Sequence, residues 1–225
     1  MRVLVVDTAL GLCSVGLFEV DSGEVRRLGL RSELMAKGHS ERVAGFARDA
    51  LAEAGLSFGT IDRIGVTVGP GSFTGLRVGL AFAQGLGAAL GRSVVGISSL
   101  DGLAASAGPG PVAALIDARR GQVYARFVEG GMESGPDEAL SLEAAAARIS
   151  VMPDGTRLIG SGASLFAEAC PDLTLLPLAG PEPGALARLA ARADPPNALP
   201  RPLYLRAPDA VPPSRLPGQA RPVRP

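Results

Sequence analysis

The sequence predicts an α/β protein made of two similar halves, each with the element order βββαβαβα. Three observations support this fold class. Apolar runs of strand length alternate with stretches whose apolar residues recur at helical spacing. The same order of elements restarts after Pro109–Pro111. The first apolar run of each half also ends in an aspartate, Asp7 in one and Asp117 in the other. Internal repetition on this scale is typical of a duplicated half-domain.

The first half is expected to span residues 1–108. Residues 2–8 form a continuous apolar run, which favours a buried central strand. The period changes at Ser40, the expected N-cap of a helix that Gly55 ends. The remaining predicted elements are strands at 13–20, 25–31, 64–68 and 94–97, and helices at 74–90 and 100–107.

The second half is expected to span residues 109–194. Its predicted strands lie at 112–117, 122–128, just before Leu140, at 158–159 and at 173–176, and its helices at 142–150, 163–169 and 184–193. Residues 195–225 hold ten of the 19 prolines, and only Leu203–Leu205 look strand-like there. We expect this segment to pack back in part and to end in a disordered tail.

Composition excludes several classes of protein. The chain has 225 residues and a formal net charge of zero, with 22 basic and 22 acidic side chains. This balance argues against a protein that binds nucleic acid unaided. Cys13 and Cys170 lie too far apart for a metal motif and form no disulfide framework. The chain has no apolar run of membrane-spanning length, so we expect a cytoplasmic protein with no membrane contact.

Isolated polar residues offer little for catalysis. His39 is the sole histidine, and one imidazole supplies neither a metal cage nor a triad. Its position at an expected helix start favours capping or a surface location. Cys13 lies within a predicted strand and is interpreted as a small buried apolar residue.

The loop Gly69-Pro-Gly-Ser-Phe-Thr-Gly75 is the most distinctive stretch of the sequence. It lies between a strand and a helix, where backbone N–H groups can receive an anion. It lacks the lysine of a P-loop, and its glycine spacing differs from the dinucleotide fingerprint. Two interpretations stay open: an anion site that includes Gly69 and Gly71, or a tight turn packed closely against its neighbours.

Asp7 and Asp117 end equivalent strands of the two halves, so they would face a common cleft. Carboxylates in such a place can hold Mg²⁺ or water near a nucleotide phosphate. The alternative, which we favour, is that each accepts backbone hydrogen bonds from the turn that follows it. Asp7, Asp117, Gly69 and Gly71 are therefore only weak candidates for cofactor contact.

A strip of small residues runs along the predicted helix at 74–90. Gly75, Gly79, Ala83 and Gly87 recur every four residues and so share one face, which another helix can approach closely. The strip packs either on the first helix of this chain or on another chain. Residues Gly45, Ala47 and Ala54 of the first helix are also small and would extend a flat docking surface.

Four segments together resemble the TsaB (YeaZ) family. They are Val3–Ala9, the block Gly69–Arg77 followed by Ala83-Gln-Gly-Leu86, the segment Ile116–Tyr124, and Pro202–Arg206. The resemblance runs from Met1 to about Gly218. It implies an actin-like ATPase/sugar kinase (ASKHA) architecture, which agrees with the repetition of elements. It also implies work in the bacterial synthesis of N6-threonylcarbamoyladenosine at position 37 of tRNA.

The family's catalytic paralogue, TsaD, implies where the chemistry would lie. TsaD holds a metal partly through an H-x-x-x-H pair, and those two positions align with Ser99 and Leu103 here. Neither side chain replaces an imidazole ligand. The resemblance therefore implies a non-catalytic subunit without a cofactor of its own, with ATP and metal on partner subunits.

The resemblance also implies the mode of association. The helices at 40–54 and 74–90 correspond to those that join TsaD in a helix bundle, with the ATPase TsaE and tRNA as further partners and a homodimer when TsaD is absent. The interface predicted on this basis consists of Ala47, Ala54, Gly75, Gly79, Ala83 and Gly87. Which of Arg77, Arg119 and Arg120 contacts tRNA stays open.

Two other functions compete with an accessory subunit. One is an independent nucleotide-dependent enzyme of the small-molecule kinase type, with Asp7, Asp117 and the Gly69–Gly75 loop around ATP. The other is a peptidase, which the sequence disfavours because it offers neither metal ligands nor a nucleophile–base pair.

Overall fold

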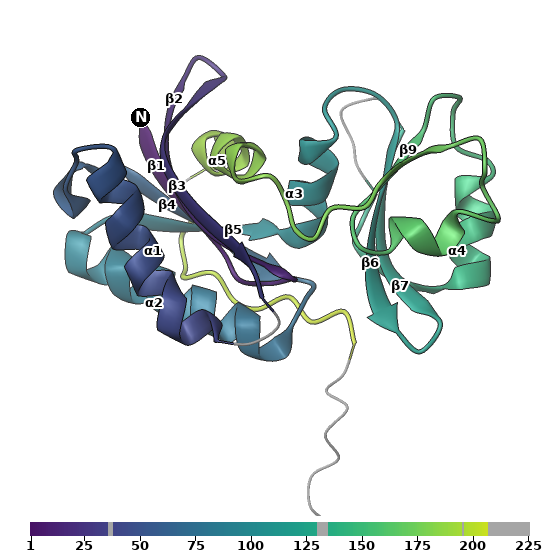
Figure 1. Cartoon of the computed structure of the whole chain (residues 1–225), viewed down its shortest axis with the longest axis horizontal. Helices are drawn as coiled ribbons and strands as arrows, with labels where there is room; N and C mark the ends of the chain where they lie inside the picture. Colours follow the sequence, from purple (N-terminus) through teal and green to yellow (C-terminus); the bar gives the residue numbers. More distant parts are fainter. Residues whose placement is uncertain (36–37, 130–134, 195, 207–225) are drawn as a thin grey trace, which may run out of the picture.

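Two five-stranded mixed sheets form the framework of the computed structural model, which describes residues 1–35, 38–129, 135–194 and 196–206 (Figure 1). The first sheet contains β1 (Arg2–Asp7), β2 (Leu12–Asp21), β3 (Glu24–Leu34), β4 (Arg63–Gly69) and β5 (Ser93–Ser98). The second contains β6 (Val112–Arg119), β7 (Gln122–Val128), β8 (Glu138–Ser141), β9 (Arg157–Ile159) and β10 (Thr174–Leu176).

Both sheets have the same topology. The strand orders are β3-β2-β1-β4-β5 and β10-β9-β6-β7-β8, so each sheet, numbered within its own half, reads 3-2-1-4-5 in one direction or the other. The central strands β1 and β6 each pair antiparallel with the next strand of the chain. On their other side they pair parallel with β4 and β9. The predicted duplicated α/β fold of the ASKHA type is therefore confirmed.

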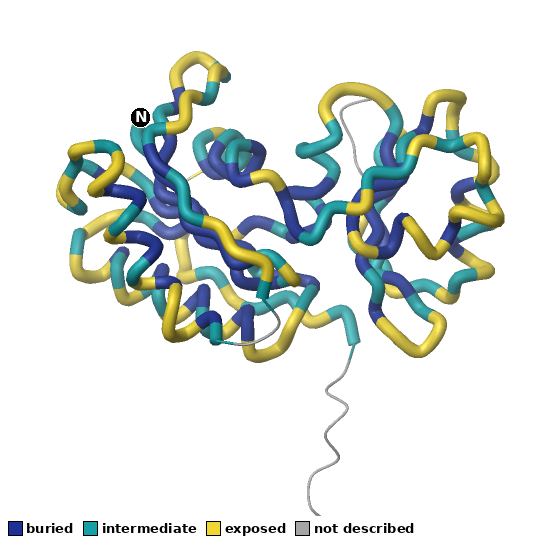
Figure 2. The backbone as a smooth tube through the Cα atoms, viewed as in Figure 1, coloured by how far each residue is buried: buried dark blue, intermediate teal, exposed yellow. Residues whose placement is uncertain are grey.

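Two helices, α1 (His39–Glu53) and α2 (Phe73–Leu90), cover one face of the first sheet (Figures 1 and 2). Their buried residues Val43, Phe46 and Leu80 pack against the apolar strand residues that point to this face. The predicted Ser40 cap is wrong, because α1 begins at His39 after Gly38, which has a positive φ. The short helix η1 (Phe58–Thr60) leads from α1 toward β4.

The last helix of each half packs against the sheet of the other half. Helix α5 (Pro183–Arg192) lies on the second face of the first sheet, where Leu186 joins the core formed by Val3 and Val5. Helix α3 (Ser99–Ser106) places Leu100 in a core with residues of β6. Neither residue range 1–108 nor 109–194 thus contains all of its own packing partners. The opposite face of the second sheet carries α4 (Leu142–Ile149) and η2 (Ala163–Phe166).

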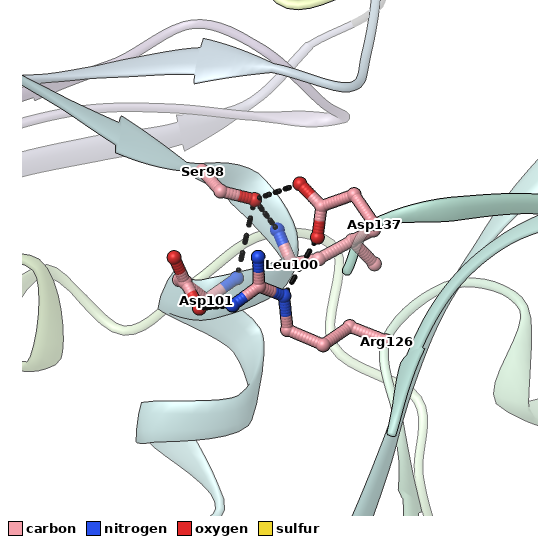
Figure 3. A network of polar contacts seen from close by, with 5 residues as sticks. All are labelled: Ser98, Leu100, Asp101, Arg126 and Asp137. Carbon is pink, nitrogen blue, oxygen red and sulfur yellow. Dashed lines mark hydrogen bonds and ion pairs between the residues drawn. The ribbon is translucent and has the colours of Figure 1, made fainter. Parts of the chain in front are cut away.

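A partly buried cluster of ion pairs joins α3 to the second sheet (Figure 3). Arg126 of β7 donates from Nε to Asp137 Oδ1 at 2.7 Å and from Nη1 to Asp101 of α3. Ser98 donates to Asp137 Oδ2 at 2.7 Å, and its Oγ also accepts from the N–H groups of Leu100 and Asp101. One cluster therefore caps α3 and ties it to the β7–β8 connection.

The chain returns to the first half after α5. Leu203 N–H donates to the Val68 carbonyl at 2.7 Å, and Gln84 of α2 donates to the Pro200 carbonyl at 2.7 Å. Residues 203–205 adopt no strand, since this single backbone bond does not extend into a ladder. The predicted disordered tail, which is the last ten residues, lies outside the described residues.

Candidate functional site

The strip of small residues on α2 faces the first sheet. A Cβ on Gly75 would collide with the Thr8 carbonyl, one on Gly79 would lie 2.5 Å from the Thr8 hydroxyl, and one on Gly87 would collide with Val94. Ala83 is fully buried in the same core. The prediction that this strip receives another chain is wrong for these four residues, because their own sheet covers them.

The two alanines predicted on α1 are also covered. Ala47 is fully buried, and Ala54 is half-buried against the same core. The small size of these residues predicted a flat docking surface, but the structure places both alanines in the same core as Ala83. Residue size could not indicate which side of the helix pair faces the sheet.

A second strip of small residues lies on the outer side of α2, where Figure 2 shows exposed residues along the helix. Ala81, Gly85, Ala88 and Ala89 are exposed there, and a Cβ on Gly85 would meet no atom within 4 Å. Arg77 is the single charged residue of α2. We call Ala81, Gly85, Ala88 and Ala89 the outer face. The outer face was not predicted from the sequence, although its spacing resembles that of the strip Gly75, Gly79, Ala83 and Gly87, which we call the inner strip.

The composition of α2 is unusually apolar for a helix that is only one-third buried. By length and mean hydropathy, 1.2 over 18 residues, it is the one helix of the described residues that could cross a membrane. The fold accounts for this composition in another way. One side of α2 packs on the sheet, and the outer face carries side chains too small to be strongly polar or apolar. The outer face is therefore a candidate docking surface for another protein.

A cleft of about 730 Å³ opens between the two halves. One wall is formed by the turn after β1 and the start of α2, including Gly71, Ser72 and Phe73. The other wall is formed by the end of β6 with Asp117 and Arg119. The remaining lining residues are Ala9, Leu10, Gly11, Ile116, Ala118, Tyr124, Ser161, Ala179, Tyr204 and Arg206. The position of Asp117 at a strand end predicted a cleft, but nothing in the sequence predicted the contribution of Tyr204 and Arg206.

Asp7 does not line this cleft. Its side chain is fully buried, and its Oδ1 accepts from the Thr67 hydroxyl at 2.7 Å and from Ala9 N–H at 3.0 Å. Burial raises the pKa of Asp7 to about 6, against the opposing effect of these two hydrogen bonds. Its Oδ2 has no partner, and a Cβ on Gly180 would lie 3.2 Å away from it. The carboxyl group is thus enclosed by the protein.

Asp117 lines the cleft but is engaged by its own turn. Its Oδ1 accepts from Arg119 N–H at 2.8 Å, and Oδ2 lies 3.4 Å from the Arg119 guanidinium. This is the turn hydrogen bond that we favoured for both aspartates. Since only Asp117 reaches the cleft surface, the structure does not bring the two carboxylates together there.

The Gly69–Gly75 loop is a closely packed turn. Ser72 N–H donates to the Ala9 carbonyl at 2.7 Å, and the Ser72 hydroxyl caps α2 by accepting from Gly75 N–H. A Cβ on Gly71 would collide with the Ala9 carbonyl, and one on Gly69, where φ is +116°, would approach Leu203. Because two of its N–H groups bond within the protein, the loop fits the packing interpretation better than the anion site.

The positions aligned with the paralogue's metal ligands are buried in α3. Leu103 belongs to the apolar core, and Ser99 is fully buried with no partner for its hydroxyl. His39 is buried too, contrary to the surface location expected for it. In the part of the chain that the structure describes, no three His, Cys, Asp or Glu side chains gather as a potential metal site.

Known proteins similar to this chain share both its sequence and its fold. The family model for TsaD, tRNA N6-adenosine threonylcarbamoyltransferase, matches residues 24–151. An uncharacterized protein of Mycobacterium tuberculosis is 38% identical over 215 residues, which cover 93% of this chain and 94% of the relative. The tRNA threonylcarbamoyladenosine biosynthesis protein TsaB of Escherichia coli is 38% identical over 128 residues, 55% of this chain and 53% of that protein.

The solved structures agree with these relatives. YeaZ from Pseudomonas aeruginosa is 32% identical, with a TM-score of 0.69 over 84% of this chain and 90% of that one. A further Pseudomonas aeruginosa structure, described as similar to peptidase YeaZ, has 32% identity and a TM-score of 0.75 over 91% of this chain and 99% of that one. The sequence motifs, the duplicated fold and these matches lead to one conclusion: the chain belongs to the TsaB (YeaZ) family.

Proposed function

We propose that this protein is an accessory subunit in the synthesis of N6-threonylcarbamoyladenosine at position 37 of bacterial tRNA. In this proposal it binds TsaD through α1 and α2, works with TsaE, and performs no chemistry alone. ATP and metal act on the partner subunits. The observation that carries the proposal is the outer face of α2, which is exposed and nearly without side chains.

The outer face suits a helical partner for a physical reason. Ala81 and Gly85 lie one turn apart, so a partner helix can approach the backbone of α2 closely and gain dispersion contacts along it. Charged residues Glu41, Arg42 and Arg48 of α1 are exposed and would form the polar edge of the contact. The same surface would form a homodimer when TsaD is absent.

The state of the two aspartates supports a non-catalytic role. A kinase-type enzyme needs carboxylates that reach the bound nucleotide and its metal. Here Asp7 is enclosed, and Asp117 is bonded to its own turn. We therefore do not favour an independent nucleotide-dependent enzyme.

Sedimentation of the full chain with TsaD tests the proposal. Gly85→Leu fills open space on the outer face, so the variant should fold normally and lose at least about tenfold in affinity for TsaD. Ala147→Leu adds a side chain at an exposed position of α4 and serves as the matched control. Equal binding of both variants would exclude this face, and omission of each component from a reconstituted tRNA modification assay would test the assignment to the pathway.

A further inference from the structure

Two aromatic rings and an arginine form an exposed stack at the rim of the cleft. The ring centroids of Phe73 and Tyr204 lie 5.4 Å apart, with their planes at 30°. The Arg77 guanidinium carbon lies 3.8 Å from the Phe73 centroid, and Arg77 Nε donates to the Tyr204 hydroxyl at 3.3 Å. Phe73 is 46% exposed and Tyr204 is 40% exposed, so both residues remain accessible to solvent although the Arg77 guanidinium lies over the Phe73 ring. Phe73 and Arg77 lie one turn apart on α2, and Tyr204 comes from the distant C-terminal part of the chain, so the stack joins two segments.

The opposite wall of the cleft is basic. Arg119 has 85% of its side chain exposed, and Arg120 beside it is exposed as well. Arg206 lines the cleft, where it donates to the Ala118 carbonyl at 3.3 Å and to Gln122, and its guanidinium lies 6.0 Å from the Tyr124 ring. These contacts fix its charge at the surface.

The local charge differs from that of the whole chain. Among the residues that line the cleft, Arg119 and Arg206 are basic and Asp117 alone is acidic. Arg77 and Arg120 add two further cations beside this lining. A protein with a net charge of zero therefore presents a concentrated basic surface, interleaved with aromatic rings, at one place.

We propose that this rim binds single-stranded RNA. An unpaired base stacks on the exposed rings of Phe73 and Tyr204, and the guanidinium groups of Arg77, Arg119 and Arg206 contact the neighbouring phosphates. Stacking on aromatic side chains beside a cationic groove is how proteins hold unpaired nucleotides. The cleft volume of about 730 Å³ leaves room for a base with its sugar. The choice of RNA rests on the proposed function in tRNA modification.

The arrangement favours RNA over a protein partner. Exposed arginines on both sides of a cleft match a chain that carries one phosphate per nucleotide, and ring faces accept any base. The outer face of α2, in contrast, has no aromatic ring and no charge among Ala81, Gly85, Ala88 and Ala89. The two surfaces are thus chemically distinct and can be tested separately.

Fluorescence anisotropy of the full chain with a labelled RNA heptamer tests this site. The variants Phe73→Leu and Tyr204→Leu keep an apolar side chain and remove the ring, and each should weaken binding about tenfold. Arg119→Gln should reduce the slope of log K against log salt by about 0.7, because one phosphate contact is lost. Leu199→Ala and Arg26→Gln change exposed residues elsewhere and should leave both quantities unchanged.

Several outcomes would overturn the inference. The inference fails if the Phe73→Leu/Tyr204→Leu double variant binds the heptamer as tightly as the wild type does. It also fails if the wild type binds the same sequence as a duplex with equal affinity. An affinity of the wild type for AMP equal to that for the heptamer would assign the rim to free nucleotides. Loss of TsaD binding with intact RNA binding in the double variant would assign the rim to a protein. If wild-type chain binds RNA through the rings but never binds TsaD, the proposed function fails and this site stands.

Discussion

Thr8 and Gly75 join the turn after β1 to the first turn of α2. The Thr8 hydroxyl donates to the Gly75 carbonyl at 2.7 Å, and the Gly75 Cα lies so close to the Thr8 carbonyl that a Cβ would collide with it. This contact sets the position of α2 on the sheet. It therefore also determines which side of the helix stays exposed and which residues reach the rim of the cleft.

The two strips of α2 should respond oppositely to enlargement. Gly79→Leu forces a side chain against Thr8 and Val66, so the free energy of unfolding should fall by about 3 kcal/mol or more. Gly85→Ala adds a methyl group in open space within a helix and should raise the free energy of unfolding by up to about 1 kcal/mol. Urea denaturation of both variants measures these changes. Equal effects would mean that the strips are assigned to the wrong sides.

Ionisation of Asp7 should destabilise the native state. Its pKa is about 6 in the folded chain against an ordinary value of 3.8, so the folded state binds the proton more tightly. The stabilisation from protonated Asp7 is complete below pH 3.8 and is lost as the pH rises through 6. This difference corresponds to about 3 kcal/mol.

Comparison with Asp7→Asn isolates this effect from the other carboxylates. The free energy of unfolding of the wild type minus that of Asp7→Asn should decrease by about 2.5 kcal/mol between about pH 4 and pH 7.5, since an asparagine side chain does not titrate. Urea titrations at several pH values measure the difference. A difference that stays constant across this range would show that Asp7 is not protonated preferentially in the folded state.

The two cysteines should differ in reactivity. Cys13 is fully buried, and burial together with the Asp7 charge raises the pKa of its thiol to about 11. Cys170 is half-buried, and burial raises the pKa of its thiol as well. Because the thiolate is the reactive form, a disulfide reagent at about pH 8 should label Cys170 in the native chain and Cys13 only on unfolding. Rapid labelling of Cys13, identified by mass spectrometry, would contradict this assignment.

The strands were the most predictable part of the fold. A buried strand needs a continuous apolar run, and residues 2–8 and 112–117 indicate one directly. The turn signals between the runs separate consecutive strands at the observed places, as Asp21-Ser-Gly23 does between β2 and β3. Among the helices, the one predicted at 163–169 forms only the 3₁₀ turn η2, Ala163–Phe166.

Long-range packing was less predictable, because periodicity identifies an apolar face but not the surface that covers it. This limit explains why the inner strip of α2 was assigned to a partner, and why the exchange of α3 and α5 between the sheets was missed. It also explains why Tyr204 was not associated with Phe73, which lies far earlier in the chain.

The Arg126 cluster should contribute to stability mainly by keeping charges paired. Arg126 contacts Asp101 and Asp137, and the Asp137 side chain is almost completely buried. Arg126→Leu leaves that carboxylate without its guanidinium, which should lower the free energy of unfolding by about 3 kcal/mol.

Asp137→Asn in the same chain should recover part of this loss, because an amide has no charge to leave unpaired and still accepts from Ser98. A double-mutant cycle measured by urea denaturation then gives a coupling energy of at least about 1 kcal/mol. Arg148→Leu, in the exposed pair with Glu138, is the matched control and should couple by less than about 1 kcal/mol. Equal coupling in both cycles would mean that the pair of Arg126 and Asp137 is no stronger than a surface ion pair.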